Sequence, residues 1–286
     1  MEVLVTGATG FLGRHIIQRL HSRGHRVTAI VRRPDAALAA PWLNNTKLIV
    51  ADLHRDPDPA LQAIPGQDAL IHLAWPGLPN YLKSFHLVEN LAGDLKFLSW
   101  AVARGLKHLV VAGSCLEYGM QYGPLREDQP TAPDTAYGLA KDALRKSLQL
   151  LKTEQAFTLQ WMRLFYTYGE GQSPKSLLPQ LNHAIDTHAS GFNLSPGDQL
   201  RDYLPVETIA EIFVAAIETP DCHGVINCCS GKPVSVYDFV TRHCRDRGSS
   251  IMINRGLYPY PAYEPFAFWG HSEKLERLNI RPSVSS

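Results

Sequence analysis

Hydrophobic residues in the first two-thirds of the chain alternate between short apolar runs and longer amphipathic stretches. The short runs are rich in valine, leucine and isoleucine, which is typical of strands buried on both faces of a parallel sheet. They predict strands over 2–6, 26–31, 47–50, 68–73, 107–113 and 157–163. The longer stretches repeat apolar residues with a helical period. They predict helices over 11–23, 81–104 and 135–154.

This alternation predicts an α/β fold. Strands joined by helices form right-handed βαβ crossovers, which build a doubly wound parallel sheet with helices on both faces. We expect a Rossmann domain over residues 1–165, with part of its sheet completed by residues 200–230. Residues 166–200 and 231–286 are expected to form a small, mainly C-terminal substrate-binding region. An amphipathic stretch at 207–219 predicts a further helix whose apolar face packs into the core.

A glycine-rich turn follows the first predicted strand and opens the first predicted helix. Glycines at three-residue spacing let the backbone approach a pyrophosphate, and the helix N-terminus presents free N–H groups to that anion. An ordinary glycine-rich turn is the alternative, but this position directly after the first strand favours dinucleotide binding. The residues of the turn expected to contact the coenzyme are Gly7, Thr9, Gly10, Phe11, Leu12 and Gly13.

The end of the second predicted strand bears on the choice of coenzyme. An acidic residue there would hydrogen-bond the adenosine ribose and favour NAD. The strand instead ends in Val31, Arg32 and Arg33, with no acid before Asp35. A guanidinium at Arg32 can pair with a 2′-phosphate, so we expect NADP, with NAD as the alternative. The alternative is that Arg32 and Arg33 are a solvated pair at the strand end and have no role in coenzyme binding.

Two further strand ends complete the predicted coenzyme site. Asp52, followed by Leu53 just after the third strand, is placed to accept a hydrogen bond from the adenine amino group. Leu73 and Ala74 follow the fourth strand and are expected to line the path toward the nicotinamide. Ligands of doubly wound sheets bind outside the carboxyl ends of the strands, where all four residues fall.

Tyr137 and Lys141 are four residues apart in a predicted helix, so their side chains lie on one face. An ammonium beside the phenol lowers the tyrosine pKa from about 10 toward working pH, which suits a proton donor or acceptor for a carbonyl or alcohol. An exposed tyrosine–lysine pair without function is the alternative. Ser114, 23 residues before Tyr137 at the end of the fifth strand, favours the catalytic interpretation.

Composition narrows the class of protein. The 286 residues are 45% hydrophobic and 19% charged, and the net charge of +1 gives no reason to expect a nucleic-acid or membrane surface. The 5 cysteines show no CxxC spacing and read as reduced thiols of a cytoplasmic protein. The 12 histidines lack metal-ligand spacing, so no metal is expected. We also expect no signal peptide and no membrane span, because the chain begins on a strand and lacks a sufficiently long apolar run.

Seven short motifs resemble the extended short-chain dehydrogenase/reductase superfamily, and within it the NAD-dependent epimerase/dehydratase family. They occur in the order typical of that family. The motifs are TGATGFLG (6–13), ADL (51–53), HLA (72–74), GSCLEYG (113–119), YGLAK (137–141), RLFYTYGEGQ (163–172) and RDYLPV (201–206). The resemblance implies a Rossmann domain for the coenzyme and a small domain that binds a nucleotide-sugar. It also implies a homodimer through helices 81–104 and 135–154, although their apolar residues could equally cover the sheet.

The resemblance assigns roles to the candidate residues. Tyr137 is implied to be the acid/base, Lys141 to tune it and hold the nicotinamide ribose, and Ser114 to hydrogen-bond the reacting oxygen of the substrate. Arg201 matches the arginine that clamps the substrate diphosphate, the alternative being a salt bridge to Asp202 or Asp198. A second diphosphate contact of the family is put in doubt, because Tyr166 stands where many relatives carry asparagine.

The residues after Ser114 bear on the type of reaction. The family's 4,6-dehydratases carry polar residues there, including a glutamate that works in water elimination, whereas this chain has Cys115 and Leu116. Leu116 cannot transfer a proton, so dehydration is not expected. Cys115 is one position away from the catalytic cysteine of the epimerase-reductases and is expected to be a buried structural thiol. For Glu117 we expect a solvent-facing or salt-bridged side chain.

The pattern Ser-x-x-Glu-Tyr-Gly at 114–119 looks most like the reductases of nucleotide-linked 4-keto-6-deoxy sugars. The sequence therefore predicts an NAD(P)H-dependent 4-keto reductase with Tyr137 as the proton donor. An NAD-dependent nucleotide-sugar 4-epimerase is the first alternative. A non-catalytic NADP-binding regulator is the second, and a reductase of a non-nucleotide carbonyl is the third.

Overall fold

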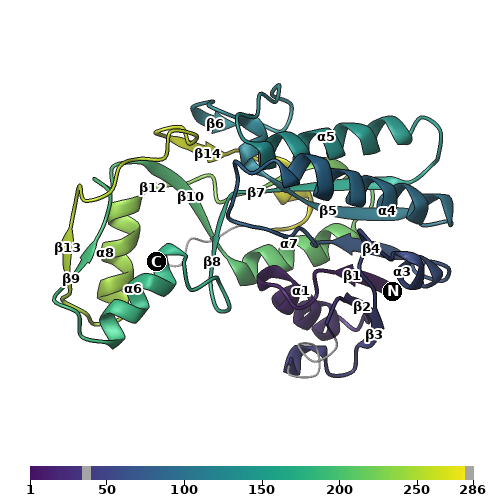
Figure 1. Cartoon of the computed structure of the whole chain (residues 1–286), viewed down its shortest axis with the longest axis horizontal. Coiled ribbons are helices and arrows are strands. Elements are labelled where there is room, and N and C mark those ends of the chain that lie inside the picture. The colour runs from purple at the N-terminus through teal and green to yellow at the C-terminus, as the bar shows by residue number, and fades with distance from the viewer. Residues whose placement is uncertain (34–39, 281–286) are drawn as a thin grey trace.

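The computed structural model describes residues 1–33 and 40–280. Seven parallel strands form its central sheet in the order β3-β2-β1-β4-β5-β7-β11 (Figure 1). The strands are β1 (Glu2–Thr6), β2 (Arg26–Val31), β3 (Lys47–Val50), β4 (Ala69–His72), β5 (His108–Ser114), β7 (Thr158–Leu164) and β11 (Gly224–Cys228). The order reverses direction between β1 and β4, which is the topology of a doubly wound Rossmann sheet. The predicted fold class is therefore confirmed.

Helices cover both faces of the sheet. On one face α1 (Phe11–Ser22) packs with α7 (Val206–Glu218), and the apolar face predicted for 207–219 is buried there. On the other face lie α3 (Asp58–Gln62), α4 (Ala92–Ala103) and α5 (Ala136–Leu151). In Figure 1 α4 and α5 run side by side on the face opposite α1 and α7.

The helix predicted over 81–104 is shorter than expected and changes character along its length. It begins with a π-helical turn, η2 (His86–Leu91), and continues as α4. The backbone N–H of Tyr137 donates to the carbonyl of Tyr81 at 2.9 Å. The segment before η2 is thus held against the start of α5 and forms turns in place of the predicted helix.

A smaller lobe lies beyond the carboxyl ends of the strands, on the left of Figure 1. Its core packs α6 (Leu177–Asp186) and α8 (Val236–Asp246) against a three-stranded sheet. The strand order of that sheet is β12 (Pro233–Ser235), β10 (Leu200–Pro205) and β8 (Tyr166–Tyr168). The rings of Tyr203 and Phe239 stack there with centroids 3.8 Å apart. The remaining elements are β6 (Gly123–Leu125), β9 (Gly191–Asn193), β13 (Met252–Asn254), β14 (Phe268–Gly270), α9 (Lys274–Arg277), η1 (Pro41–Leu43) and η3 (Cys115–Tyr118). Within residues 200–230, β11 joins the central sheet whereas β10 belongs to this smaller lobe.

Three observations concern only the described residues. All five cysteines are free and buried there. No helix within 1–33 or 40–280 has the length and apolar character needed to span a bilayer. The same ranges contain no group of three histidine, cysteine or acidic side chains arranged to hold a metal ion.

Candidate active site

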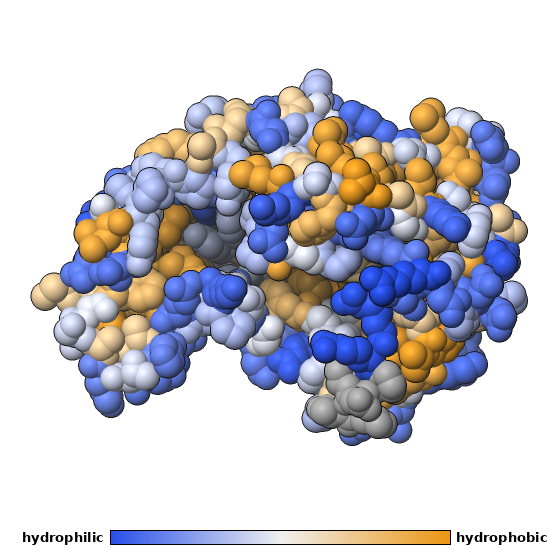
Figure 2. Space-filling view, in the orientation of Figure 1, coloured by the Kyte–Doolittle hydropathy of each residue, from blue (hydrophilic) through white to orange (hydrophobic). Residues whose placement is uncertain are grey.

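Two adjoining cavities lie at the carboxyl ends of the parallel strands, and the inner one extends to the smaller lobe. The coenzyme-side cavity has a volume of about 220 Å³, and the inner cavity has a volume of about 790 Å³. They share Gly7, Gly10, Leu73 and Trp75 as lining residues, so they form one continuous path. Figure 2 shows the molecular surface hollowed between the two lobes.

The path passes over the glycine-rich turn between β1 and α1. Gly7 has a φ of +69°, and a Cβ there would lie 2.8 Å from the backbone nitrogen of Ala74. A Cβ on Gly13 would lie 2.3 Å from the carbonyl oxygen of Gly7. Any larger residue would therefore disrupt the turn or its packing. The open backbone at the start of α1 fits the pyrophosphate of a dinucleotide.

The predicted coenzyme residues from separate strand ends meet along this path. In the coenzyme-side cavity, the lining residues named by the sequence are Gly7, Thr9, Gly10, Arg32, Asp52, Leu53, Leu73 and Ala74. In the inner cavity they are Gly7, Gly10, Phe11, Leu12, Gly13, Leu73, Ser114, Tyr137 and Arg201. Lys141 lines neither cavity and is only 2% exposed. The fold thus gathers the glycine turn, Arg32 and the serine–tyrosine pair at one edge of the sheet.

Ser114 and Tyr137 lie together at the bottom of the inner cavity. Ser114 is the last residue of β5, and Tyr137 is in the first turn of α5, whose N-cap Thr135 accepts from the Gly138 backbone N–H at 3.0 Å. Burial raises the pKa of Tyr137 well above its usual value of 10, and a side-chain hydrogen bond with Ser114 opposes that rise. At neutral pH Tyr137 is therefore a protonated phenol, the form that donates a proton.

The surroundings of the buried Lys141 contradict one prediction made from the sequence. Its Nζ donates to the carbonyl oxygen of Ala112 at 2.8 Å and lies 3.8 Å from the ring centroid of Trp75. Burial lowers the pKa of Lys141 to about 8, although Asp94 and other acids oppose this shift. The predicted lowering of the Tyr137 pKa by this ammonium is wrong, because burial of the phenol dominates.

The side chain of Glu117 holds the backbone at the end of β5, in addition to the salt bridge that the sequence analysis allowed. It is fully buried, and its Oε1 accepts from the backbone N–H of Ser114 at 2.7 Å. Its Oε2 accepts from Arg163 Nε at 2.9 Å, and the indole of Trp161 donates to both carboxylate oxygens. The solvent-facing alternative is wrong and the salt-bridged one is confirmed. The serine–x–x–glutamate spacing of a capping box was the signal available in the sequence.

The two residues after Ser114 lie in the wall of the inner cavity. Cys115 is buried, and burial raises the pKa of its thiol to about 12. A thiol with that pKa is protonated at neutral pH and is a poor base. Leu116 contributes an apolar surface, so this wall supplies no group with the acid/base chemistry of a water elimination.

Arg201 lines the inner cavity but is only 1% exposed. Its Nη2 pairs with Glu264 Oε2 at 2.9 Å, and its Nε donates to the Tyr166 hydroxyl at 3.2 Å. The predicted alternative, a salt bridge from Arg201 to Asp202 or Asp198, is wrong, because each of these carboxylates binds other groups. Asp202 accepts backbone N–H groups from the loop after β11 and from Gly270, and Asp198 pairs with Arg255.

A buried network positions the loop that joins the two cavities. Asp94 on α4 is fully buried; its carboxylate lies 2.8 Å from His54 Nε2 and 3.2 Å from His72 Nε2. The other ring nitrogen of His72 is 2.9 Å from the Thr6 hydroxyl oxygen, which accepts from the backbone N–H groups of 73–74. The sequence interpretation missed this network, because its members come from four separate elements.

The chain matches the NAD dependent epimerase/dehydratase family over residues 3–229. It belongs to that family. It is 28% identical to the dTDP-6-deoxy-L-talose 4-dehydrogenase (NAD(+)) of Aggregatibacter actinomycetemcomitans, over 94% of this chain and 99% of that one. It is 26% identical to UDP-glucose 4-epimerase 1 of Oryza sativa subsp. japonica, over 95% and 88% of the two chains. The fold superimposes with a TM-score of 0.85 on MoeE5 in complex with UDP-glucose and NAD, at 24% identity and covering 100% and 94%.

We predict that Asp94→Asn destabilises the protein by about 3–5 kcal/mol, because it breaks a buried ion pair. Burial acts to raise the pKa of Asp94, but His72 and His54 outweigh it and hold the pKa at about 2, below the usual 3.8. The stability contributed by the carboxylate is therefore present above about pH 4 and is lost as the pH falls toward 2. Urea unfolding of both proteins across this range measures the difference.

Glu89→Gln is the matched control, because Glu89 is an exposed acid of η2. It should change the free energy of unfolding by no more than about 0.5 kcal/mol. Equal stability of Asp94→Asn and the native chain at pH 7 would contradict the assigned role of the network.

Proposed function

We propose that this protein is a nicotinamide-dependent 4-oxidoreductase of a nucleotide-linked 6-deoxy sugar, acting as a reductase of the 4-keto form. The observation that carries the proposal is that Ser114 and Tyr137 line the same cavity, which adjoins the cavity over the glycine turn. A carbonyl placed against this pair would meet a hydrogen-bond donor and a proton source. A coenzyme bound along the path would supply the hydride to that carbonyl.

The residues of the chain then have separate tasks. The phenol of Tyr137 gives its proton to the oxygen of the reduced carbonyl, and Ser114 holds that oxygen by a hydrogen bond. Lys141 packs against the ring of Trp75, which contacts the ring of Tyr137 edge-on at 5.8 Å, and so helps to position the phenol. Leu73 and Trp75 exclude water where the two cavities join.

The substrate class is supported by the relatives and by the cavity. One relative is named for 4-dehydrogenation of dTDP-6-deoxy-L-talose, and the reverse of such a reaction reduces a 4-keto sugar. We propose that Arg201 contacts the diphosphate of the nucleotide. Its pairing with Glu264 must then loosen when the substrate binds, because a guanidinium donor cannot serve both anions fully.

A 4-epimerase is the second candidate, favoured by the match to UDP-glucose 4-epimerase 1. An epimerase uses the same proton donor but returns the hydride to the opposite face of the sugar. The two functions differ in net redox change, because the reductase consumes coenzyme and the epimerase regenerates it. A non-catalytic regulator would not need a buried, protonated tyrosine beside a serine at the end of a coenzyme path.

A panel of nucleotide-linked sugars tests the reaction. Purified protein is mixed with NADH or NADPH and with each nucleotide-linked 4-keto-6-deoxy sugar in turn. The absorbance of the reduced coenzyme at 340 nm should fall with at least one of these sugars. In the reverse direction the protein should reduce NAD or NADP when it is given the matching nucleotide-linked 6-deoxy sugar, which carries a hydroxyl group at C4. Interconversion of intact nucleotide-hexoses without net coenzyme consumption would contradict the reductase function and support the epimerase function.

Tyr137→Phe should lower kcat by about 10²–10⁴, because the variant keeps the ring but loses the transferable proton. The dissociation constant of the coenzyme should change little, since the glycine turn and strand ends are untouched. Steady-state kinetics and coenzyme fluorescence titration measure the two effects. Tyr122→Phe, at a tyrosine 61% exposed, is the control and should retain full activity. Full activity of Tyr137→Phe would disprove the assigned proton donor.

The choice of coenzyme is tested at Arg32. The names of the related dehydrogenase and of the MoeE5 complex include NAD, which favours NAD. Arg32 lines the coenzyme-side cavity and could pair with a 2′-phosphate, which favours NADP. We propose that the protein uses NAD and also accepts NADP through this arginine. Arg32→Ala should raise the KM for NADPH about tenfold and leave that for NADH nearly unchanged. Arg33→Ala, beside it but outside the cavity, is the control, and equal effects on both coenzymes would contradict the assignment.

We also propose a homodimer through α4, α5 and the π-helical turn η2. Exposed apolar side chains of these elements support it, namely Val88 of η2, Trp100 of α4, and Leu139 and Leu150 of α5. Their burial in a second copy would remove apolar surface from water. A monomeric mass at micromolar concentration in light scattering would argue against this dimer.

A further inference from the structure

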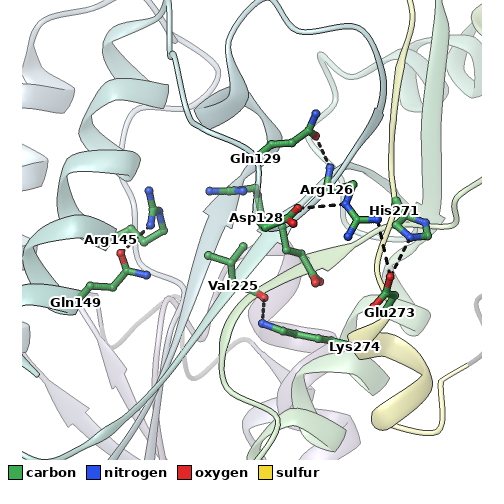
Figure 3. Close-up of a pocket in the computed structure, with 11 residues that line it drawn as sticks. Arg126, Asp128, Gln129, Arg145, Gln149, Val225, His271, Glu273 and Lys274 are labelled. Atoms are coloured by element: carbon green, nitrogen blue, oxygen red, sulfur yellow. Dashed lines mark hydrogen bonds and ion pairs between the residues drawn. The ribbon is translucent and has the colours of Figure 1, made fainter.

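A third cavity lies away from the candidate active site, and we call it the Arg163 cavity. It has a volume of about 480 Å³, the size of a small-molecule site. The segment after β6, helix α5, strands β7 and β11, and the start of α9 enclose it (Figure 3). Among the described residues it shares none of its lining with the two cavities of the candidate active site.

Arg163 forms part of the wall of this cavity although its side chain is only 1% exposed. Its Nε donates to Glu117 Oε2 at 2.9 Å, and its guanidinium lies 4.2 Å from the ring centroid of Tyr118. Its Nη1 is buried and has no hydrogen-bond partner among the described residues. A buried guanidinium N–H without an acceptor is costly, so the arrangement lacks one acceptor.

Arg145 lines the cavity beside Arg163. Its Nη2 pairs with Asp142 at 2.6 Å, and its Nη1 donates to the amide oxygen of Gln149 at 2.8 Å. Its Nε is buried without a hydrogen bond in the described structure and lies 3.7 Å from Glu117 Oε2. Figure 3 shows Arg145 and Gln149 side by side at the edge of the cavity.

The carboxylates behind this wall are shared among the cations and do not satisfy all of the arginine N–H groups. Arg145 and Arg163 share the single carboxylate of Glu117. The carboxylate of Asp142 is likewise shared, between Arg145 and Lys146. Lys146 is exposed and lies outside the cavity, so two arginines face two carboxylates at the wall, and what the arginines lack is an acceptor for Arg163 Nη1 and for Arg145 Nε. Buried arginine forks with N–H groups that lack an acceptor are suited to a phosphate or carboxylate group.

The opposite side of the cavity is acidic and open to water. Arg126 lies between Asp128, at 3.2 Å, and Glu273, at 3.8 Å, and both carboxylates are largely exposed (Figure 3). Glu127 is already engaged, because its Oε1 accepts from the backbone N–H of Asn227 at 2.8 Å. The exposed carboxylates can accept hydrogen bonds from hydroxyl groups. A second anion on that side would be repelled.

We propose that the Arg163 cavity binds a small hydroxylated metabolite by its anionic group. A phosphate or carboxylate lies against Arg163 and Arg145, and hydroxyl groups face Asp128 and Glu273. This site is separate from the candidate active site and does not rest on the function proposed for it.

The variant that tests the cavity must keep the fold. Arg163→Gln would leave Glu117 buried without its closest ion-pair partner and is expected to destabilise the protein. Gln149→Glu changes an exposed side chain and places a carboxylate beside Arg145 Nη1, where it competes with a bound anion for the guanidinium. Gln18→Glu, the same change at an exposed position of α1, is the matched control.

Isothermal titration of the full chain with glycerol 3-phosphate and with glycerate, at constant ionic strength, measures binding. We expect one saturable site for at least one of the two, about tenfold weaker in Gln149→Glu and unchanged in Gln18→Glu. Which probe binds more tightly distinguishes a phosphate from a carboxylate ligand. Absence of saturable binding of both probes, or equal affinity in the native chain and Gln149→Glu, would overturn the proposal. Unchanged circular dichroism of both variants excludes unfolding as the cause.

Discussion

The buried carboxylate of Glu117 is the contact on which the arrangement around the end of β5 depends. It caps the turn that begins at Ser114 and accepts hydrogen bonds from two residues of β7, Trp161 and Arg163. A buried carboxylate is stable only when its lone pairs are filled and its charge is compensated, and here both conditions are met. Removing it would release the serine turn and leave two arginines of the neighbouring cavity without their shared anion.

The same physical rule explains the other buried charges near the site. Asp94 is compensated by two histidines from different strand ends, and through Thr6 it positions the loop at 73–74. Arg201 is compensated by Glu264 within the inner cavity. In the first case the pairing supports the cavity wall. In the second the pair faces the cavity, so a bound anion would compete with the carboxylate for the guanidinium.

Much of the candidate site follows from local patterns. Strands β1, β2 and β3 coincide with their predicted ranges. For β1 and β2 the reason is that short runs of branched apolar residues at turn-bounded positions have few alternatives to a buried strand. The glycine turn follows from the same reasoning, and its tight contacts at Gly7 and Gly13 give the physical reason for the glycines. Predictions failed where the partner of a charged group was distant in sequence. Glu264 lies 63 residues after Arg201, and no periodic pattern connects them.

The sequence by itself determined the doubly wound sheet, the position of the dinucleotide turn and the candidate trio of Ser114, Tyr137 and Lys141. These depend on residue periodicity, on glycine geometry and on the order of strand ends, all of which are local or follow from topology. Only the tertiary structure decided the protonation of Tyr137, the burial of Glu117, the partner of Arg201 and the existence of the Arg163 cavity. Each of these depends on how much water and how much opposite charge surround a side chain, which is known only once distant segments have packed together.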